Sequence, residues 1–159
     1  MHIALVTGAS RGIGKAIAKQ LSIDGYYVII NYKSDKNEAE KTLKEIQKSG
    51  GKAELLPFDV SDVNQVQYYL NNWQEKNKDK YIDILVNNAG INKDNLMVFM
   101  TDDDWHKVIN TNQNGFFYVT RTLLKDMIVN KGGRIITITS LSGQKGLAGQ
   151  VNYSASKGS

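Results

Sequence analysis

Apolar and polar positions follow two alternating patterns along the chain. Short apolar runs bounded by Gly or polar turns predict five strands, at residues 2–7, 27–31, 53–58, 82–86 and 134–139. Between these runs apolar residues recur at helical spacing, as in Ile13, Ile17 and Leu21. This β-α-β-α order predicts an α/β fold with a parallel sheet covered on both faces and a ligand site at the carboxyl ends of the strands.

Polar residues indicate where the predicted helices begin. Asp35 and Glu38 form a capping-box pair, and Ser61 is expected to cap the next helix. The acidic turn 101–104 predicts the start of a long helix. The apolar face of that helix, over residues 105–128, is wide, which suggests burial by the sheet and by a partner subunit.

Composition fits one domain over residues 1–159, since 41% of the residues are apolar and no repeat or linker interrupts the pattern. The absence of Cys excludes disulfides and thiolate metal sites, and we assign no metal role to His2 or His106. No apolar run reaches membrane-spanning length, and strand-like sequence begins almost at Met1, so we expect a soluble cytoplasmic protein.

The net charge of +4 is spread among acidic residues and resembles no nucleic-acid-binding stripe. A solvated surface explains most of this charge. Attraction to an anion, such as a phosphorylated cofactor or an acidic carrier protein, stays open as an alternative.

A glycine-rich loop joins the first predicted strand to the first helix. Gly8, Gly12 and Gly14 permit a tight turn, close approach of a pyrophosphate and close packing of helix on strand. The helix N-terminus then offers free N–H groups to the anion. An ordinary glycine-rich turn is the alternative, but the position between strand and helix favours a dinucleotide site.

The end of the second strand indicates which dinucleotide binds. An NAD site has Asp or Glu there to hold the ribose hydroxyls. This chain has Asn31 and Lys33 instead, and Asp35 is better explained as a helix cap. With Arg11 in the glycine loop, these residues would accept a 2′-phosphate, so the sequence predicts NADP(H) rather than NAD(H).

The end of the chain carries a candidate proton donor. Tyr153 and Lys157 are four residues apart and share one face if a helix begins near Asn152. An ammonium beside a phenol, sheltered from water, makes the phenol more acidic. Ser140, at the end of the fifth strand, could hydrogen-bond the carbonyl that is protonated.

Together these segments resemble the short-chain dehydrogenase/reductase family, whose fold is Rossmann-like. The resemblance rests on the glycine loop, on Asn-Asn-Ala-Gly at residues 87–90 and on Tyr-x-x-x-Lys at residues 153–157. It covers the whole chain with the motifs in family order. It implies a catalytic set of Asn112, Ser140, Tyr153 and Lys157. It also implies cofactor contacts by Gly8, Ser10, Arg11, Gly12, Ile13, Gly14, Asn31, Lys33, Asp59, Val60, Asn87, Ala89, Gly90, Tyr153 and Lys157.

The resemblance also implies a role for each catalytic residue in ketone reduction. Tyr153 would be the general acid, Ser140 would hold the substrate oxygen, and Lys157 would increase the acidity of the tyrosine and bind the nicotinamide ribose. Asn112 would anchor a water that links Lys157 to solvent. Three alternatives stay open: Ser142 in place of Ser140, a purely bracing amide at Asn112, and a sheet-bracing role for Asn87.

Four further segments, at residues 88–94, 133–136, 143–146 and 149–153, carry a closer resemblance within the family. By these segments the chain resembles NADPH-dependent 3-oxoacyl-carrier-protein reductases and acetoacetyl-CoA reductases. This similarity implies an acyl thioester substrate, a possible acyl-carrier-protein partner that docks near Lys131, and a homodimer or homotetramer at full length. A helix-end lysine is at least as good an explanation of Lys131.

Family members normally continue beyond the Tyr-x-x-x-Lys segment, so C-terminal strands and helices are expected to be missing here. An isolated chain of this length is expected to be unstable, aggregated or inactive. Two alternatives to the reductase therefore stay open: a non-catalytic nucleotide-binding fragment, and a reductase of a sugar, steroid or polyketide carbonyl.

Overall fold

A five-stranded parallel sheet forms the centre of the molecule in the computed structural model, which describes residues 2–159. The strand order is β3-β2-β1-β4-β5, and every neighbouring pair is parallel. The chain therefore winds outward in both directions from β1, so that the first crossover lies next to the glycine loop. The strands are β1 (Ile3–Val6), β2 (Tyr27–Tyr32), β3 (Ala53–Pro57), β4 (Ile84–Asn87) and β5 (Arg134–Thr137).

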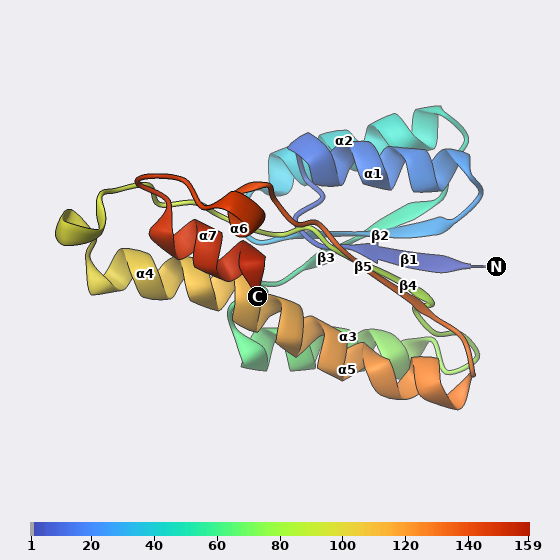
Figure 1. The fold of residues 1–159 in the computed structure, drawn as a ribbon. Helices are drawn as coiled ribbons and strands as arrows, with labels where there is room; N and C mark the ends of the chain where they lie inside the picture. The colour runs from blue at the N-terminus through green and yellow to red at the C-terminus, as the bar shows by residue number, and fades with distance from the viewer. Residues whose placement is uncertain (1) are drawn as a thin grey trace.

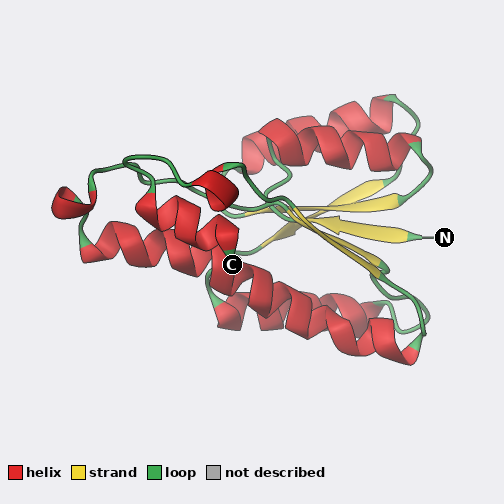
Figure 2. Cartoon of the chain, viewed as in Figure 1, coloured by secondary structure: helices red, strands yellow, loops and turns green. Residues whose placement is uncertain are grey.

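Helices cover both faces of the sheet, as Figures 1 and 2 show. On one face α1 (Gly12–Ile23) and α2 (Lys36–Lys48) bury Ala18, Ala39 and Ile46 against alternate strand residues. On the other face lie α3 (Val63–Lys76) and α5 (Gly115–Val129), whose Leu70 and Leu123 pack on the opposite set of strand residues. The predicted doubly wound, Rossmann-like α/β fold is confirmed.

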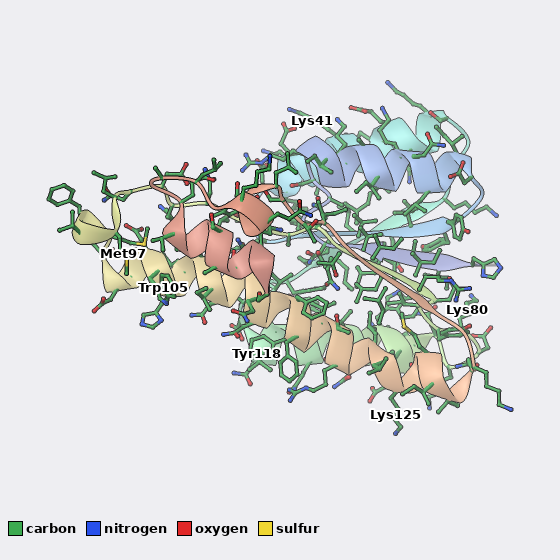
Figure 3. The ribbon with its side chains drawn as sticks, in the orientation of Figure 1. Lys41, Lys80, Met97, Trp105, Tyr118 and Lys125 are labelled. Atoms are coloured by element: carbon green, nitrogen blue, oxygen red, sulfur yellow. The ribbon has the colours of Figure 1, made fainter. Side chains whose placement is uncertain are left out.

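The remaining helices gather at the carboxyl ends of the strands (Figure 1). A short 3₁₀ turn, η1 (Met97–Phe99), follows β4, and Figure 3 shows its Met97 at the end of the molecule beyond α4. The chain continues as α4 (Asp102–Ile109), a π-helical turn η2 (Asn110–Asn114) and α5. After β5 come α6 (Ser142–Lys145) and α7 (Val151–Gly158), and α7 packs on α6, α4 and η2.

The predicted strands all exist, but their limits differ by one or two residues. The fourth strand begins at Ile84 rather than at residue 82, because its ladder with β1 starts at the pair Ala4–Ile84. Ile82 is buried without joining the ladder. The fifth strand ends at Thr137 rather than at residue 139, because its pairing with β4 ends at Asn87.

Helices begin after Asp35 and in the acidic turn 101–104, as the sequence predicts. Asp35 accepts a hydrogen bond from the N–H of Glu38, and Thr101 caps α4 through the N–H of Asp104. The expectation that Ser61 caps α3 is wrong. Asp62 accepts from the first-turn N–H groups instead, since the Ser61 hydroxyl donates to Asp59.

The long helix predicted after the acidic turn is interrupted by the π turn. Its Val108, Val119, Leu123 and Met127 are buried, whereas apolar residues on its other side, including Phe117, are exposed in this chain. Both Ile135 and Ile136 of the neighbouring β5 are also exposed. Burial on the sheet side is therefore observed, and cover by a partner subunit stays a prediction.

Within residues 2–159, no helix is long and apolar enough to cross a membrane.

Replacing Leu70 with Ala should lower the free energy of unfolding by about 2–5 kcal/mol, because the side chain is fully buried between α3 and the sheet. Gln67→Ala on the exposed side of the same helix is the control and should change it by less than about 0.5 kcal/mol. Urea unfolding of both variants checks this, and equal effects would contradict the packing described.

Candidate active site

A cleft of about 1030 Å³ opens at the carboxyl ends of the strands. Its walls come from the glycine loop, the ends of β2 and β3, the segments after β4 and β5, and α7. These are the segments in which the sequence predicts functional residues. The predicted residues that line the cleft are Gly8, Ser10, Arg11, Gly12, Ile13, Gly14, Asn31, Lys33, Asp59, Val60, Ala89, Gly90, Ser140, Tyr153 and Lys157.

The glycine loop has the backbone that its sequence predicts. Gly8 and Gly12 have φ angles of 62° and 58°, which favour glycine. A Cβ on Gly14 would lie 2.5 Å from the Gly8 carbonyl oxygen, so this position admits no side chain without a shift. No side chain within the described residues caps the start of α1, so its first-turn N–H groups face the cleft uncapped.

The Asn31 side chain holds the glycine loop in place through hydrogen bonds. Its Oδ1 accepts from the Gly8 N–H at 3.1 Å, and its Nδ2 donates to the carbonyls of Leu56 and Phe58. The side chain is buried. The sequence predicts that Asn31 helps to accept a 2′-phosphate, but its hydrogen-bonding groups join the glycine loop, β2 and β3, because Asn31 lies within β2 rather than after it.

Lys33 directly follows β2, and its exposed side chain lines the cleft. Its Nζ lies 2.6 Å from Asp59 Oδ2, and Asp59 Oδ1 accepts from the N–H and the hydroxyl of Ser61. Burial acts to raise the pKa of Asp59, but the hydrogen bonds from Lys33 and Ser61 outweigh it and lower that pKa below its ordinary value. Asp59 is therefore a fixed carboxylate at this end of the cleft.

The segment after β4 is held by Thr7 and Asn88. The buried Thr7 hydroxyl oxygen accepts from the N–H groups of Asn88 and Ala89, both at 3.0 Å. Asn88 Nδ2 donates to the carbonyls of Thr7 and Gly8. These bonds fix Ala89 and Gly90 beside the glycine loop.

Asn87 does not line the cleft. Alternate residues of a strand point to opposite faces, and Asn87 shares the α3 and α5 face with Leu85. Its Nδ2 donates to Thr120 Oγ1 on α5 at 3.1 Å. Of its two predicted roles, this geometry matches the sheet-bracing one and not the cofactor contact.

Tyr153 and Lys157 share one face of α7, as their spacing predicts. Lys157 Nζ lies 6.0 Å from the centroid of the Tyr153 ring and donates to the Ile138 carbonyl at 2.7 Å. Burial lowers the pKa of Lys157. The Tyr153 hydroxyl has no hydrogen-bond partner within the described part of the chain and is available to a ligand in the cleft.

Ser140 also lines the cleft, next to a chain of hydrogen bonds. The Ser142 N–H donates to Ser140 Oγ at 3.2 Å, and the Ser142 hydroxyl donates to Gln150 Oε1. Gln150 Nε2 in turn donates to Asp94. Because the Ser142 hydroxyl is engaged with Gln150, the geometry favours Ser140 over Ser142 as the hydroxyl that meets a substrate.

Asn112 lies in the π turn, outside the main cleft. Its Oδ1 accepts from the Ile91 N–H, and its Nδ2 donates to the Ile91 carbonyl and to Ser156 Oγ. This buried amide joins η2, the segment after β4, and α7. A second cavity of about 10 Å³, close to the volume that one water needs, is lined by Asn112, Thr111 and Lys157 among others.

Several residues of the site were not identified as functional from the sequence. Thr7 and Ser156 act through hydrogen bonds that only the folded chain creates. Asn152 is fully buried, and its Nδ2 donates to the Lys93 carbonyl. The one available signal was position in the predicted elements, since Thr7 ends a buried strand and Asn152 begins a helix.

Within residues 2–159, no cluster of three or more His, Cys, Asp or Glu is arranged to hold a metal ion.

The sequence profile of the family described as short chain dehydrogenase matches residues 2–159. The chain is 43% identical over 156 residues to a 3-oxoacyl-[acyl-carrier-protein] reductase of Synechocystis, with 98% of this chain and 62% of the relative covered. It is 40% identical over 154 residues to the 3-oxoacyl-[acyl-carrier-protein] reductase FabG of Staphylococcus epidermidis, covering 97% of this chain and 62% of the relative. The chain thus spans 62% of the length of these two relatives.

The fold is also similar to a solved structure. A crystal structure of a proposed gluconate dehydrogenase from Agrobacterium tumefaciens superposes with a TM-score of 0.94 at 35% identity. The match covers 99% of this chain and 61% of that one.

Asn112→Ala should destabilise the protein by about 1–3 kcal/mol, because it removes the side chain that pairs with both the N–H and the carbonyl of Ile91. Gln113→Ala, exposed in the same π turn, is the control and should have little effect. Urea unfolding measures the stability, and amide hydrogen exchange should show faster exchange at Ile91 in the first variant alone. Unchanged exchange at Ile91 would rule out the bracing role.

Proposed function

The chain belongs to the short chain dehydrogenase family, and from this membership we propose that it is part of an NADPH-dependent reductase of 3-oxoacyl thioesters. The product would be the 3-hydroxyacyl thioester, and the pathway fatty-acid synthesis. One observation carries the proposal: the glycine loop and the pair Tyr153 and Lys157 line the same cleft. We further propose that residues 1–159 form a single nucleotide-binding domain.

The cleft fits a dinucleotide. A Cβ on Gly12 would meet nothing within 4 Å, so the backbone there is open to a phosphate. The uncapped N-terminus of α1 favours an anion at the same place. Gly8, Ser10, Arg11, Ile13 and Gly14 would hold the pyrophosphate, Asp59 and Val60 the adenine, and Ala89 and Gly90 the nicotinamide side.

The catalytic residues have distinct roles in this proposal. The bound nicotinamide would supply a hydride to the substrate carbonyl carbon. Ser140 would donate a hydrogen bond to the carbonyl oxygen, and Tyr153 would give that oxygen its proton. Lys157 would stabilise the resulting tyrosinate through its charge and bind the nicotinamide ribose.

A supply of protons is needed because each reduction consumes one. Lys157 lines both the main cleft and the small cavity beside Asn112. A water in that cavity could connect the ammonium to solvent, which is the role proposed for Asn112. Its amide also braces the site, so the two roles predicted for this residue are compatible.

The acyl thioester is the substrate class favoured by the names of the two relatives. The similarity to a proposed gluconate dehydrogenase supports a second candidate, a sugar-derived hydroxyl or carbonyl compound. NADPH oxidation with acetoacetyl-CoA, compared with NADP⁺ reduction with gluconate, separates the two candidates. Higher kcat/KM for the thioester supports the first.

Assembly is part of the proposal. The exposed side of α5 carries Phe116, Phe117 and Leu124, which a second subunit in a homodimer or homotetramer would cover. Acyl carrier protein is a possible further partner. Light scattering tests the assembly, and a stable monomer would count against it.

Tyr153→Phe should lower kcat by about 100- to 10 000-fold, because it removes the general acid while the ring remains. The Kd of NADPH should change little. Steady-state kinetics and fluorescence titration measure the two effects, with Tyr68→Phe, exposed on α3, as the control. Near-normal turnover of the Tyr153→Phe variant would refute the assignment of Tyr153.

The wild-type protein should bind NADPH about tenfold more tightly than NADH, a difference of about 1.4 kcal/mol. Lys33 follows β2, where NAD enzymes have an acid, and Arg11 lines the same cleft. Isothermal titration with both dinucleotides provides the test. Equal or tighter binding of NADH contradicts the proposed cofactor.

A further inference from the structure

We propose that Asp59 sets the cofactor preference by holding Lys33 in an ion pair that the 2′-phosphate of NADPH must open. We call the Lys33–Asp59 pair the latch. This inference rests on the proposed function, since it assigns a specificity-determining residue to the same dinucleotide cleft. Asp59 is thereby a specificity-determining residue that acts through Lys33.

The two residues of the latch differ in burial and in the hydrogen bonds that hold them. Asp59 has a side chain only 16% exposed, and its Oδ1 accepts two hydrogen bonds from Ser61, at 2.9 and 2.7 Å. Its own N–H donates to Gln65 Oε1. Lys33 has a side chain 67% exposed, and its only ion-pair partner within residues 2–159 is Asp59 Oδ2, at 2.6 Å. The latch thus joins a carboxylate held by hydrogen bonds to an exposed ammonium.

The charges around the latch explain why it matters for a phosphate. Arg11, Lys33, Asp35 and Asp59 are the charged residues that line the cleft beside the glycine loop and the end of β2. While the latch is closed, Asp59 neutralises Lys33, and of the two cations Arg11 alone is left without an ion pair in the described chain. A 2′-phosphate carries nearly two negative charges and competes with the single carboxylate for the ammonium. NADH has no such group, so its binding leaves the latch closed.

The contribution of Lys33 to the NADPH preference therefore equals the gain from the phosphate–Lys33 contact minus the cost of opening the latch. Neutralising Asp59 removes that cost. Any contact between Asp59 and the adenine is common to both dinucleotides, so it cancels in the ratio Kd(NADH)/Kd(NADPH). This ratio is the quantity that reports on the latch.

Asp59→Asn tests the proposal, because the amide can keep the acceptor for Ser61 and loses the charge that holds Lys33. The ratio, measured by isothermal titration, should rise about three- to tenfold in this variant. Lys33→Met should lower the ratio. In the Lys33→Met background, adding Asp59→Asn should have less than half of its effect on the ratio, since there is no cation left to release.

Asp35→Asn is the matched control. It removes the same charge from the same cleft, and Asn caps a helix as well as Asp does. A rise in the ratio that Asp35→Asn reproduces in full, or that persists undiminished without Lys33, would show general repulsion and overturn the latch. Wild-type preference for NADPH with an unchanged ratio in Asp59→Asn overturns the latch alone, whereas a wild-type protein that binds neither dinucleotide overturns the proposed function as well.

Discussion

The hydrogen bond from Lys157 Nζ to the Ile138 carbonyl is the contact on which the geometry of the cleft depends. Ile138 follows β5, whereas Lys157 lies in α7, so this bond holds a short helix against the end of the sheet. A helix of this length has little stability of its own, and tertiary contacts must keep it in place. The same bond fixes the position of the ammonium relative to the Tyr153 ring.

Buried amides and hydroxyls extend this arrangement to the rest of the site. Asn31 supports the glycine loop, Thr7 and Asn88 join that loop to the segment after β4, and Asn112 joins that segment to α7. Each of these side chains satisfies backbone groups that the ends of strands leave unpaired. The cleft is therefore shaped by polar side chains that face the protein, while Arg11, Ser140 and Tyr153 are left to face a ligand. Such preorganisation allows the groups facing the ligand to act without large rearrangement.

Local patterns in the sequence were sufficient to predict the strands, the order of the helices and the segments that meet at the cleft. The glycine loop and the i, i+4 pair of Tyr153 and Lys157 depend on local backbone geometry, which local sequence determines. Local patterns could not predict three features: the π turn around Asn112, the hydrogen bonds from Asn31 to the β3 end, and the capping of α3 by Asp62 instead of Ser61. Each depends on a partner distant in the chain or on competition between neighbouring acceptors, and no periodicity records such contacts. The pairing of Lys33 with Asp59 is of the same kind, since a whole helix and a strand separate the two residues in the chain.

We propose that a dinucleotide binds in one cleft, between the glycine loop and α7. Chemical-shift mapping of the ¹⁵N-labelled protein with NADPH tests it most directly. Binding in this cleft should shift the amides of Gly8 to Gly14, of Ala89 and Gly90, and of Tyr153 and Lys157 in a single saturable transition. Shifts confined to other surfaces, or no shifts at saturating NADPH, would contradict it.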